Sequence, residues 1–388
     1  MNLKYSCLLT VFIIISCNKS EPNLKEIIKI DPRAFSGNEI ALSYISDDIR
    51  YISLDNSILI GDITSFEIAR NSIYVNSCDT LLIKYDRTGQ NPQRIGRRGR
   101  GPGEYATCKF YAIDNNSGKI YIHGRNYSIL VYSGDGNFLK SIQLSQDVGF
   151  GAKDMAFFGN SDLFIGQNTI GSQNKYDWVI LDTLGNIKSY KENPISPFET
   201  KIGVLSGIIK FKENISYWNS YQDTIFTVFP DYAYKVFYML TPGEHRAPKK
   251  NSSLKQMFEY YTPILFFETQ NYLIHRYTYR GKRVYVFINK EDSEAFIIPI
   301  QGQKTVYGGI ANDLDGGPVF RPACYFIDNS YEYLAGVVQT LELKSYVASN
   351  DFQNSTPKYP EKKKELERLA NSLDENDNPV LMLVKLKN

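Results

Sequence analysis

The chain has 388 residues, of which 43% are hydrophobic and 22% are charged, so it is long and apolar enough to bury a substantial core. Its 44 basic and 42 acidic side chains give a net charge of +2, which excludes a surface built as a whole for nucleic acid or anionic membranes. Tyrosine and phenylalanine number 29 and 22, and aromatic side chains suit the half-buried faces of sheets, so the composition favours an all-β fold.

The first sixteen residues, MNLKYSCLLTVFIIIS, have the pattern of an export signal. Lys4 supplies a positive charge, and residues 8–15 form a short apolar run. A membrane-spanning helix needs about 20 apolar residues, so this run is too short to be a transmembrane anchor. We therefore predict a signal peptide over residues 1–16.

Cys17 follows this signal directly, and the sequence Ile-Ile-Ser-Cys at the junction resembles the lipobox of bacterial lipoproteins. In a lipobox the cysteine thiol receives diacylglycerol, and the cysteine becomes the N-terminus of the mature protein. We expect lipid on Cys17, a polar tether over residues 17–36 and a single domain over residues 37–388. A plain secretory signal followed by a chance cysteine is the alternative.

Three cysteines remain once the signal is removed and Cys17 carries lipid, namely Cys78, Cys108 and Cys324. An odd number of cysteines in an exported domain of this size does not make a disulfide framework. The sequence leaves two alternatives open, one bridge between Cys78 and Cys108 or three buried thiols.

Three similar units follow one another in the first half of the chain. Each begins with a short apolar strand, passes through a polar stretch, resumes as a second apolar strand and ends in a turn that contains glycine. The units span residues 73–90, 120–137 and 163–186, and their turn glycines are Gly89, Gly136 and Gly185. Three or four antiparallel strands repeated roughly every 45 to 60 residues are typical of propeller blades.

The second half of the chain contains similar units at less regular spacing. Its units span residues 215–240, 272–300 and 322–338 joined to 379–387. The count predicts a six-bladed β-propeller of four-stranded antiparallel blades, with five or seven blades as alternatives. We expect strands at residues 39–45 and 380–386 to share the last blade and close the ring, because an open ring would expose two sheet edges.

One segment has the periodicity of a helix rather than of a strand. In PEKKKELERLANSL, which begins at Pro360, apolar residues recur at i, i+3, i+4 and i+7. Proline is favoured in the first turn of a helix. We therefore predict one short C-terminal helix inserted before the last strand.

These features together resemble a family of six-bladed β-propeller lipoproteins of Gram-negative bacteria. The resemblance rests on the lipobox at Cys17, the blade repeat, the RGRGPGEY stretch, the NDLDGG stretch at residues 312–317 and the helix followed by Asn378 and Pro379. It covers nearly all of the mature chain. It implies a propeller anchored by lipid in the outer membrane, facing the periplasm or the cell surface, and it implies no particular activity.

Residues 95–105, IGRRGRGPGEY, combine four glycines with three arginines. They match neither a dinucleotide fingerprint, which would need glycine at position 104, nor a Walker loop, which needs Gly-Lys-Ser or Gly-Lys-Thr. We interpret the stretch first as a tight turn. The alternative is a recognition loop in which Arg97, Arg98 and Arg100 present their donors to a carboxylate or a sulfate, with Glu104 and Tyr105 as further candidate binding residues. Binding of phosphate or nucleic acid is a third alternative.

A second candidate region contains Asp313, Asp315 and Arg321. The two aspartates hint at a calcium loop, but the twelfth position counted from Asp313 is Cys324, where an EF-hand needs glutamate. We interpret the aspartates as turn formers, with a calcium site shared by several blades as the alternative. The three histidines form no zinc motif and Gly-x-Ser-x-Gly is absent, so the sequence predicts no metal, no cofactor and no catalytic residue.

The sequence thus predicts a monomeric, lipid-anchored propeller of the cell envelope that acts as a binding or scaffold module. Its expected partners are the membrane, through the anchor, and a carbohydrate, a peptide or an envelope protein, but no nucleic acid. Ligands of propellers commonly bind on one face of the central channel, where loops from all blades converge. The alternative function is a lyase or hydrolase with its active site at the channel mouth, with or without calcium.

Overall fold

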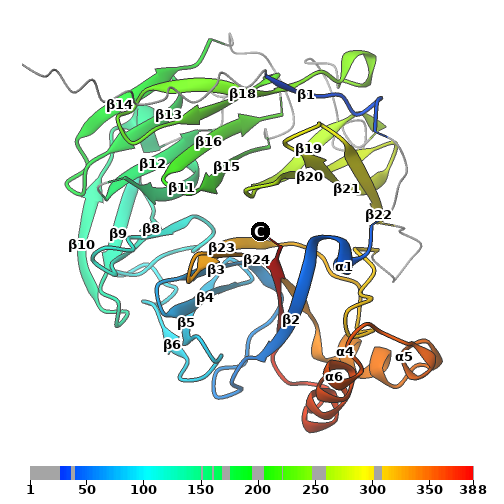
Figure 1. Ribbon diagram of the computed structural model, residues 1–388. Helices are drawn as coiled ribbons and strands as arrows, with labels where there is room; N and C mark the ends of the chain where they lie inside the picture. The colour runs from blue at the N-terminus through cyan, green and yellow to red at the C-terminus, as the bar shows by residue number, and fades with distance from the viewer. Residues whose placement is uncertain are drawn as a thin grey trace, which may run out of the picture.

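Six small antiparallel sheets stand around a central axis and form a six-bladed propeller (Figure 1). The structure is a computed structural model, and it describes residues 27–35, 40–149, 152–159, 161–167, 175–194, 205–220, 222–246, 259–300 and 308–387. The predicted all-β fold with six blades is confirmed.

Each blade is a meander of four strands whose first strand lies nearest the axis (Figure 1). The first three blades consist of β3 (Ile63–Ala69), β4 (Ser72–Ser77), β5 (Leu81–Asp86) and β6 (Gln93–Arg94); β7 (Tyr111–Ile113), β8 (Ile120–His123), β9 (Ser128–Tyr132) and β10 (Phe138–Gln143); and β11 (Ala152–Phe158), β12 (Asp162–Gln167), β13 (Tyr176–Leu181) and β14 (Ile187–Glu192). The other three consist of β15 (Ser206–Phe211), β16 (Asn214–Asn219), β17 (Thr224–Val228) and β18 (Tyr234–Leu240); β19 (Thr262–Glu268), β20 (Tyr272–Tyr279), β21 (Lys282–Asn289) and β22 (Ala295–Ile300); and β23 (Cys324–Asp328), β24 (Tyr331–Val338), β25 (Val380–Leu386) and β2 (Ser46–Ser53).

The middle strands of the blades are apolar because neighbouring blades cover both of their faces. β4, β9 and β13 are buried along their whole length. The outermost strands β10 and β14 are mostly exposed and contain more polar residues. A strand that is buried on both faces reads as a continuous apolar run, which is why the repeat units were visible in the sequence.

The turns that close the predicted units have left-handed glycines. Gly89, Gly136 and Gly185 have φ values of 81°, 77° and 94°. In the first of these turns, Asp86 Oδ1 accepts a hydrogen bond from the N–H of Gln90 at 3.0 Å. Glycine adopts positive φ without the steric cost that a Cβ brings, so the turns follow directly from the local sequence.

The ring closes within the sixth blade, where strands from the two ends of the chain pair. β2 runs antiparallel to β25, from Ser46 beside Leu386 to Ser53 beside Val380. The N-terminal chain thus supplies the outermost strand of a blade whose other three strands come from the C-terminal part. The prediction that both ends share the last blade is therefore confirmed.

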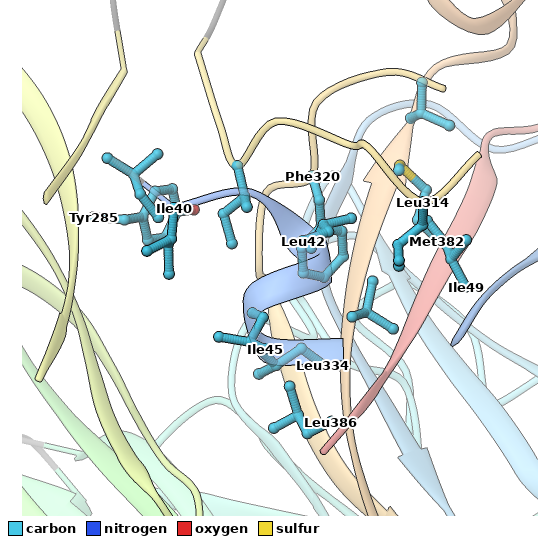
Figure 2. Packing of buried hydrophobic residues seen from close by; sticks show 14 of the residues in the cluster. Ile40, Leu42, Ile45, Ile49, Tyr285, Leu314, Phe320, Leu334, Met382 and Leu386 are labelled. Carbon is cyan, nitrogen blue, oxygen red and sulfur yellow. The ribbon is translucent and has the colours of Figure 1, made fainter. Parts of the chain in front are cut away.

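The predicted position of the N-terminal closing strand, residues 39–45, is wrong. The closing strand is β2, and the chain just before it forms a short helical turn, α1 (Leu42–Ile45). Leu42 and Ile45 both point into a hydrophobic cluster with Phe320 and Leu334 (Figure 2). A separation of three residues puts two side chains on the same side of a helical turn, and burial of both favours the turn over an extended strand.

Three helices, not one, separate β24 from β25. The predicted helix is α6 (Pro360–Ser372), and α4 (Thr340–Val347) and α5 (Asn350–Asn354) precede it. The prediction of a single helix missed α4 and α5 because each is too short for a helical period to stand out. Two further short turns are α2 (Gln146–Gly149) and the 3-10 turn η1 (Gly243–His245).

Part of the expected tether is folded onto the propeller. β1 (Ile28–Ile30), within the range 17–36, pairs with β18 in parallel and makes the fourth blade five-stranded. Residues 1–26, which include the predicted signal peptide and Cys17, lie outside the described residues. No helix in the described part of the chain is long and apolar enough to cross a membrane.

The three remaining cysteines are free thiols. Cys78 is exposed, whereas Cys108 and Cys324 are buried, so no bridge joins Cys78 to Cys108. Burial raises the pKa of both buried thiols to about 12. Neither buried thiol is therefore a reactive nucleophile at neutral pH.

Candidate functional site

The two faces of the propeller differ in which connections they carry. Because the strands of a blade alternate in direction, the connections from first to second strand and from third to fourth strand emerge on one face, which we call the mouth face. The connections from second to third strand and from one blade to the next emerge on the opposite face.

A cavity of about 450 Å³ lies at the end of the central channel on the mouth face. Five of the six blades contribute side chains to it, for example Glu67, Asp114, Phe157, Lys210 and Tyr325. Such a volume is within the range of about 300–1,000 Å³ that is usual for small-molecule sites. The cavity is therefore the candidate functional site.

An ion pair spans the channel between the first and fourth blades. Lys210 Nζ lies 2.6 Å from Glu67 Oε1, and the two side chains are 40% and 22% exposed. Desolvation opposes the charge on the amine, but the neighbouring Glu67 carboxylate outweighs this penalty and raises the pKa of Lys210. Lys210 is therefore charged at neutral pH, beside the side chain of Glu67.

Asp154 from the third blade is a second carboxyl group close to this pair. Its Oδ1 accepts a hydrogen bond from the N–H of Met155 at 2.9 Å, and its Oδ2 accepts one from the N–H of Ile208 at 3.2 Å. Burial raises the pKa of Asp154 to about 6, and Lys210 opposes that rise while Glu67 adds to it. Asp154 thus changes charge close to neutral pH, unlike an ordinary aspartate.

The rim of the cavity is built from the turns between first and second strands. Asn116 Nδ2 donates to Ser161 Oγ at 2.8 Å, and Ser161 Oγ donates to Asp114 Oδ1 at 3.1 Å, which ties the second blade to the third. Arg70 and Lys212 occupy turn positions with φ of 51° and 54°, and both are exposed. The rim therefore presents charged and amide groups on short, well-fixed turns.

The loop at residues 95–105 is organised around Glu104. Its carboxylate accepts a hydrogen bond from the N–H of Gly101 at 2.8 Å, and Oε1 lies 2.5 Å from Arg97 Nε. The Gly101 N–H is the main cause that lowers the pKa of Glu104. Arg98 and Arg100 are exposed. The structure agrees with the interpretation as a turn and leaves these two arginines as candidates for recognition.

Tyr105 is part of the core. Its side chain is fully buried, packs edge-on against Tyr132 and accepts a hydrogen bond from the N–H of Leu82 at 3.4 Å. Burial raises the pKa of Tyr105 to about 12. A ligand outside the loop does not reach this ring, so Tyr105 positions the loop.

The second predicted region is also tied into the fold. Asp313 accepts hydrogen bonds from the backbone and hydroxyl of Ser43, at 2.9 and 2.5 Å. Asp315 is fully buried and accepts hydrogen bonds from Asn312 Nδ2 at 2.6 Å and from the N–H of Gly317 at 2.9 Å. Arg321 forms an ion pair of 3.1 Å with Glu342 on α4.

The predicted candidate residues do not come together in one place. The loop with Arg98 and the loop with Asp313 both connect one blade to the next and so emerge on the opposite face, and neither contributes to the lining of the channel-mouth cavity. Among the described residues, no group of three or more His, Cys, Asp or Glu side chains is placed to hold a metal ion.

Sequence reasoning missed Glu67, Asp154 and Lys210, although a signal was present. Each is a charged residue inside a short apolar segment, FEIA, KDMAFF or GIIKF, that forms the first strand of a blade. A charged side chain in a largely buried strand costs free energy unless it has a partner or lines a water-filled space. Because this pattern recurs in several blades, it would have indicated charged side chains that face the central channel.

The comparisons with known proteins support the fold. A family model described as a domain of unknown function, DUF4934, matches residues 25–385. A candidate exported protein of Bacteroides fragilis shares 19% identity, with a TM-score of 0.69 over 93% of this chain and 100% of the other. A member of the DUF4221 family from Bacteroides vulgatus shares 12% identity, with a TM-score of 0.50 over 91% and 99% of the two chains.

A more distant structural similarity is to a lyase. Virginiamycin B lyase from Staphylococcus aureus shares 9% identity, with a TM-score of 0.45 over 87% of this chain and 99% of the lyase. At that distance the likeness says nothing about activity. No curated protein matches the chain.

Proposed function

The chain belongs to the DUF4934 family, and we propose that it is a lipid-anchored binding module of the cell envelope whose ligand site is the mouth of the central channel. The observation that carries the proposal is the cavity of about 450 Å³ on the mouth face, which is lined by both charge signs. The ligand class that fits it best is a short peptide or another small molecule with both an amine and a carboxylate.

Export and anchoring are supported by the N-terminal sequence. The short apolar signal and Cys17 at its end have the spacing of a lipoprotein junction. The structural similarity to a candidate exported protein agrees with export. Several acyl chains on one residue would hold the propeller at a membrane stably, since a single chain binds only marginally.

The rim of the cavity carries charged side chains that have no ion-pair partner in the described part of the chain. These charges indicate the ligand class. Arg70 and Glu213 line the cavity, both are exposed, and neither takes part in an ion pair with another described residue. A guanidinium group binds a carboxylate through two parallel hydrogen bonds, and a carboxylate binds an amine. A peptide can satisfy both groups at once, whereas an uncharged sugar can satisfy neither by charge.

Binding is testable by calorimetry with the mature chain carrying Cys17→Ser, against a panel of short peptides and of neutral oligosaccharides. Arg70→Gln should weaken peptide binding about tenfold or more, which corresponds to a loss of about 1.4 kcal/mol. Arg280→Gln is the matched control, because Arg280 is also an exposed turn arginine, with φ of 49°, but lies on the opposite face. It should leave peptide affinity unchanged.

Two outcomes would contradict this ligand class. Equal effects of Arg70→Gln and Arg280→Gln would remove the channel mouth as the site. Binding of oligosaccharides but not of peptides would assign the aromatic side chains Phe157 and Tyr325 of the cavity, rather than its charges, as the recognition surface.

One observation favours catalysis as the second candidate function. Asp154, with its pKa raised to about 6, lies close to Lys210 and could accept a proton near neutral pH. A hydrolase or lyase at the channel mouth would lose turnover of its substrate in Asp154→Asn with little change in affinity. A binding module would show an effect on affinity alone.

A further inference from the structure

We propose that the loop at residues 95–105 and the start of β10 together form a surface that docks onto an anionic lipid bilayer. We call this surface the arginine patch, and it comprises Arg98, Arg100, Phe138 and Leu139. None of these residues lines the cavity at the channel mouth. The contact is therefore separate from the proposed ligand site, and it does not depend on an acyl chain at Cys17.

The loop carries a strong excess of positive charge. Residues 94–104 contain four arginines and a single acidic residue, Glu104. Glu104 is paired with Arg97, whereas the exposed Arg98 and Arg100 form no ion pair with any residue that the structure describes. The neighbouring turn at residues 133–140 does not offset this excess, because it contains one aspartate and one lysine. The loop therefore attracts an anionic partner.

Two large apolar side chains lie exposed beside these arginines. Phe138 and Leu139, at the start of the outermost strand of the second blade, are 42% and 49% exposed. Phe138 is in contact with the loop, since a Cβ placed on Gly103 would lie 2.5 Å from its ring. Arginine next to exposed phenylalanine and leucine is typical of protein surfaces that lie at a membrane interface.

Hydrogen bonds hold the two parts of the patch together. The hydroxyl of Tyr132 on β9 donates to the carbonyl oxygen of Gly103 at 2.9 Å. The N–H of Gly96 donates to the carbonyl oxygen of Gly136, in the turn between β9 and β10, at 3.1 Å. A surface that is already held in place loses little conformational freedom when it binds, so the patch is prepared for contact.

An anionic bilayer accounts for both the charged and the apolar part of the patch. Guanidinium groups form paired hydrogen bonds with phosphate oxygens, and basic groups close to an anionic membrane are attracted to it. Phenylalanine and leucine lose contact with water when they enter the boundary between headgroups and acyl chains. A soluble polyanion would use the arginines alone and would leave Phe138 and Leu139 exposed to water.

A second basic turn provides a matched control for charge. Arg280, Lys282 and Arg283 are all exposed at the turn between β20 and β21. No large hydrophobic side chain of this hairpin, which the structure describes over residues 272–289, is exposed. This turn therefore has the charge of the arginine patch without its apolar part, and we expect it to contribute little to membrane binding.

Co-sedimentation with lipid vesicles tests the proposal on the mature chain carrying Cys17→Ser, which has no acyl chain. Its partition should be at least about tenfold stronger into phosphatidylcholine vesicles with roughly one quarter phosphatidylglycerol than into pure phosphatidylcholine, and should fall as salt is added. Arg98→Gln combined with Arg100→Gln should weaken this partition about tenfold or more. Arg280→Gln combined with Arg283→Gln should weaken it less than about twofold, because these arginines lie far from the patch.

A further variant tests the apolar part of the patch. Leu139→Ser should weaken partition into the anionic vesicles about fivefold, because serine gains little by leaving water. Leu341→Ser is the matched control, since Leu341 is 54% exposed on α4, away from the patch. It should leave the partition unchanged.

Equal partition into neutral and anionic vesicles, or no binding to either, would overturn the proposal, as would equal losses in the two arginine variants. An unchanged partition in Leu139→Ser, or binding to dextran sulfate without binding to vesicles, would assign the arginines to a soluble polyanion instead of a bilayer. None of these measurements uses a ligand of the channel mouth, so their failure would leave the proposed ligand site standing.

Discussion

Single residues decide whether a polar loop is available to a ligand. In the loop at residues 95–105, the carboxylate of Glu104 engages Arg97 and the N–H of Gly101, so much of the loop's polarity is satisfied internally. A Cβ at Gly99 would overlap that carboxylate, so a larger residue there would displace Glu104 from its contacts with Arg97 and Gly101. The loop exposes Arg98 and Arg100 to solvent, and Arg97 as well, although Arg97 is paired with Glu104.

The conformation of this loop depends on Gly103. It has φ of 70°, and a Cβ there would lie 2.5 Å from the ring of Phe138. Gly103→Ala should therefore lower the free energy of unfolding by about 1–2 kcal/mol, through backbone strain and steric overlap. Chemical denaturation measures this against Arg100→Ala, which changes an exposed side chain and should cost less than about 0.5 kcal/mol. Equal losses in both variants would contradict the structural role of the turn.

Asp154 makes the stability of the propeller depend on pH in a definite direction. Its pKa is raised from 3.8 to about 6, so between these values the folded state binds more protons than the unfolded state. The free energy of unfolding contributed by Asp154 is therefore highest below pH 4 and falls as the pH rises through about 6, by at most about 3 kcal/mol.

Urea unfolding at pH 4.5 and pH 7.5 tests this dependence. Asp154→Asn should gain stability relative to the wild type at pH 7.5, because its amide cannot ionise, and the gain should shrink at pH 4.5. Asp135→Asn is the control, because Asp135 lies exposed in a turn of the second blade. If Asp154→Asn shows the same difference from wild type at both pH values, Asp154 is not held in a desolvating site.

Among the elements, β2 and β25 bring the two ends of the chain together in the sixth blade. Side-chain hydrogen bonds add to the strand pairing there. Asn378, just before β25, is 2% exposed. Its Oδ1 accepts a hydrogen bond from the N–H of Ile60 at 3.0 Å, and its Nδ2 donates to the carbonyl oxygens of Asp55 and Ile58 at 2.8 and 2.9 Å. The Asn378 side chain thus links the loop after β2 to the start of β25 through hydrogen bonds.

Asn378→Ala should lower the free energy of unfolding by about 1–3 kcal/mol, because it leaves three partly buried backbone groups without these partners. The matched control is Asn371→Ala on α6, where the side chain is exposed and the change should be close to neutral. Thermal and urea unfolding measure both variants. A loss below about 0.5 kcal/mol for Asn378→Ala would show that other groups or water hold the seam.

At the scale of the whole molecule, β25 is the strand that makes the ring continuous. It lies between β24 and β2 and is buried over nearly its whole length. A chain that ends at Pro379 would lose this central strand and would leave unpaired the edges of both neighbours. We expect such a chain to unfold or aggregate as a whole.

Size-exclusion chromatography and a melting curve of the truncated chain check this expectation. A chain that ends at Lys387 is the control and should behave like the full chain, because β25 is intact. A soluble truncated chain with one unchanged melting transition would show that the ring does not depend on closure through β25.

The blades could be predicted from local patterns in the chain. Continuous apolar runs, turn glycines such as Gly89 and Gly136, and a repeat at nearly constant spacing are local features that dictate local structure, so blade number and strand order could be predicted. The helix at α6 was also predictable, because thirteen residues are long enough for a helical period to appear.

The candidate site, in contrast, depends on how the blades are arranged around the axis. Glu67, Asp154 and Lys210 lie far apart in the sequence and meet because closure of the ring brings the first strands of different blades around one axis. The same closure placed Tyr105 and Asp315 in the interior, although their sequence context resembled that of binding loops. Which side chains converge and which are buried depends on the packing of the blades, and this packing is a property of the closed ring rather than of any one segment.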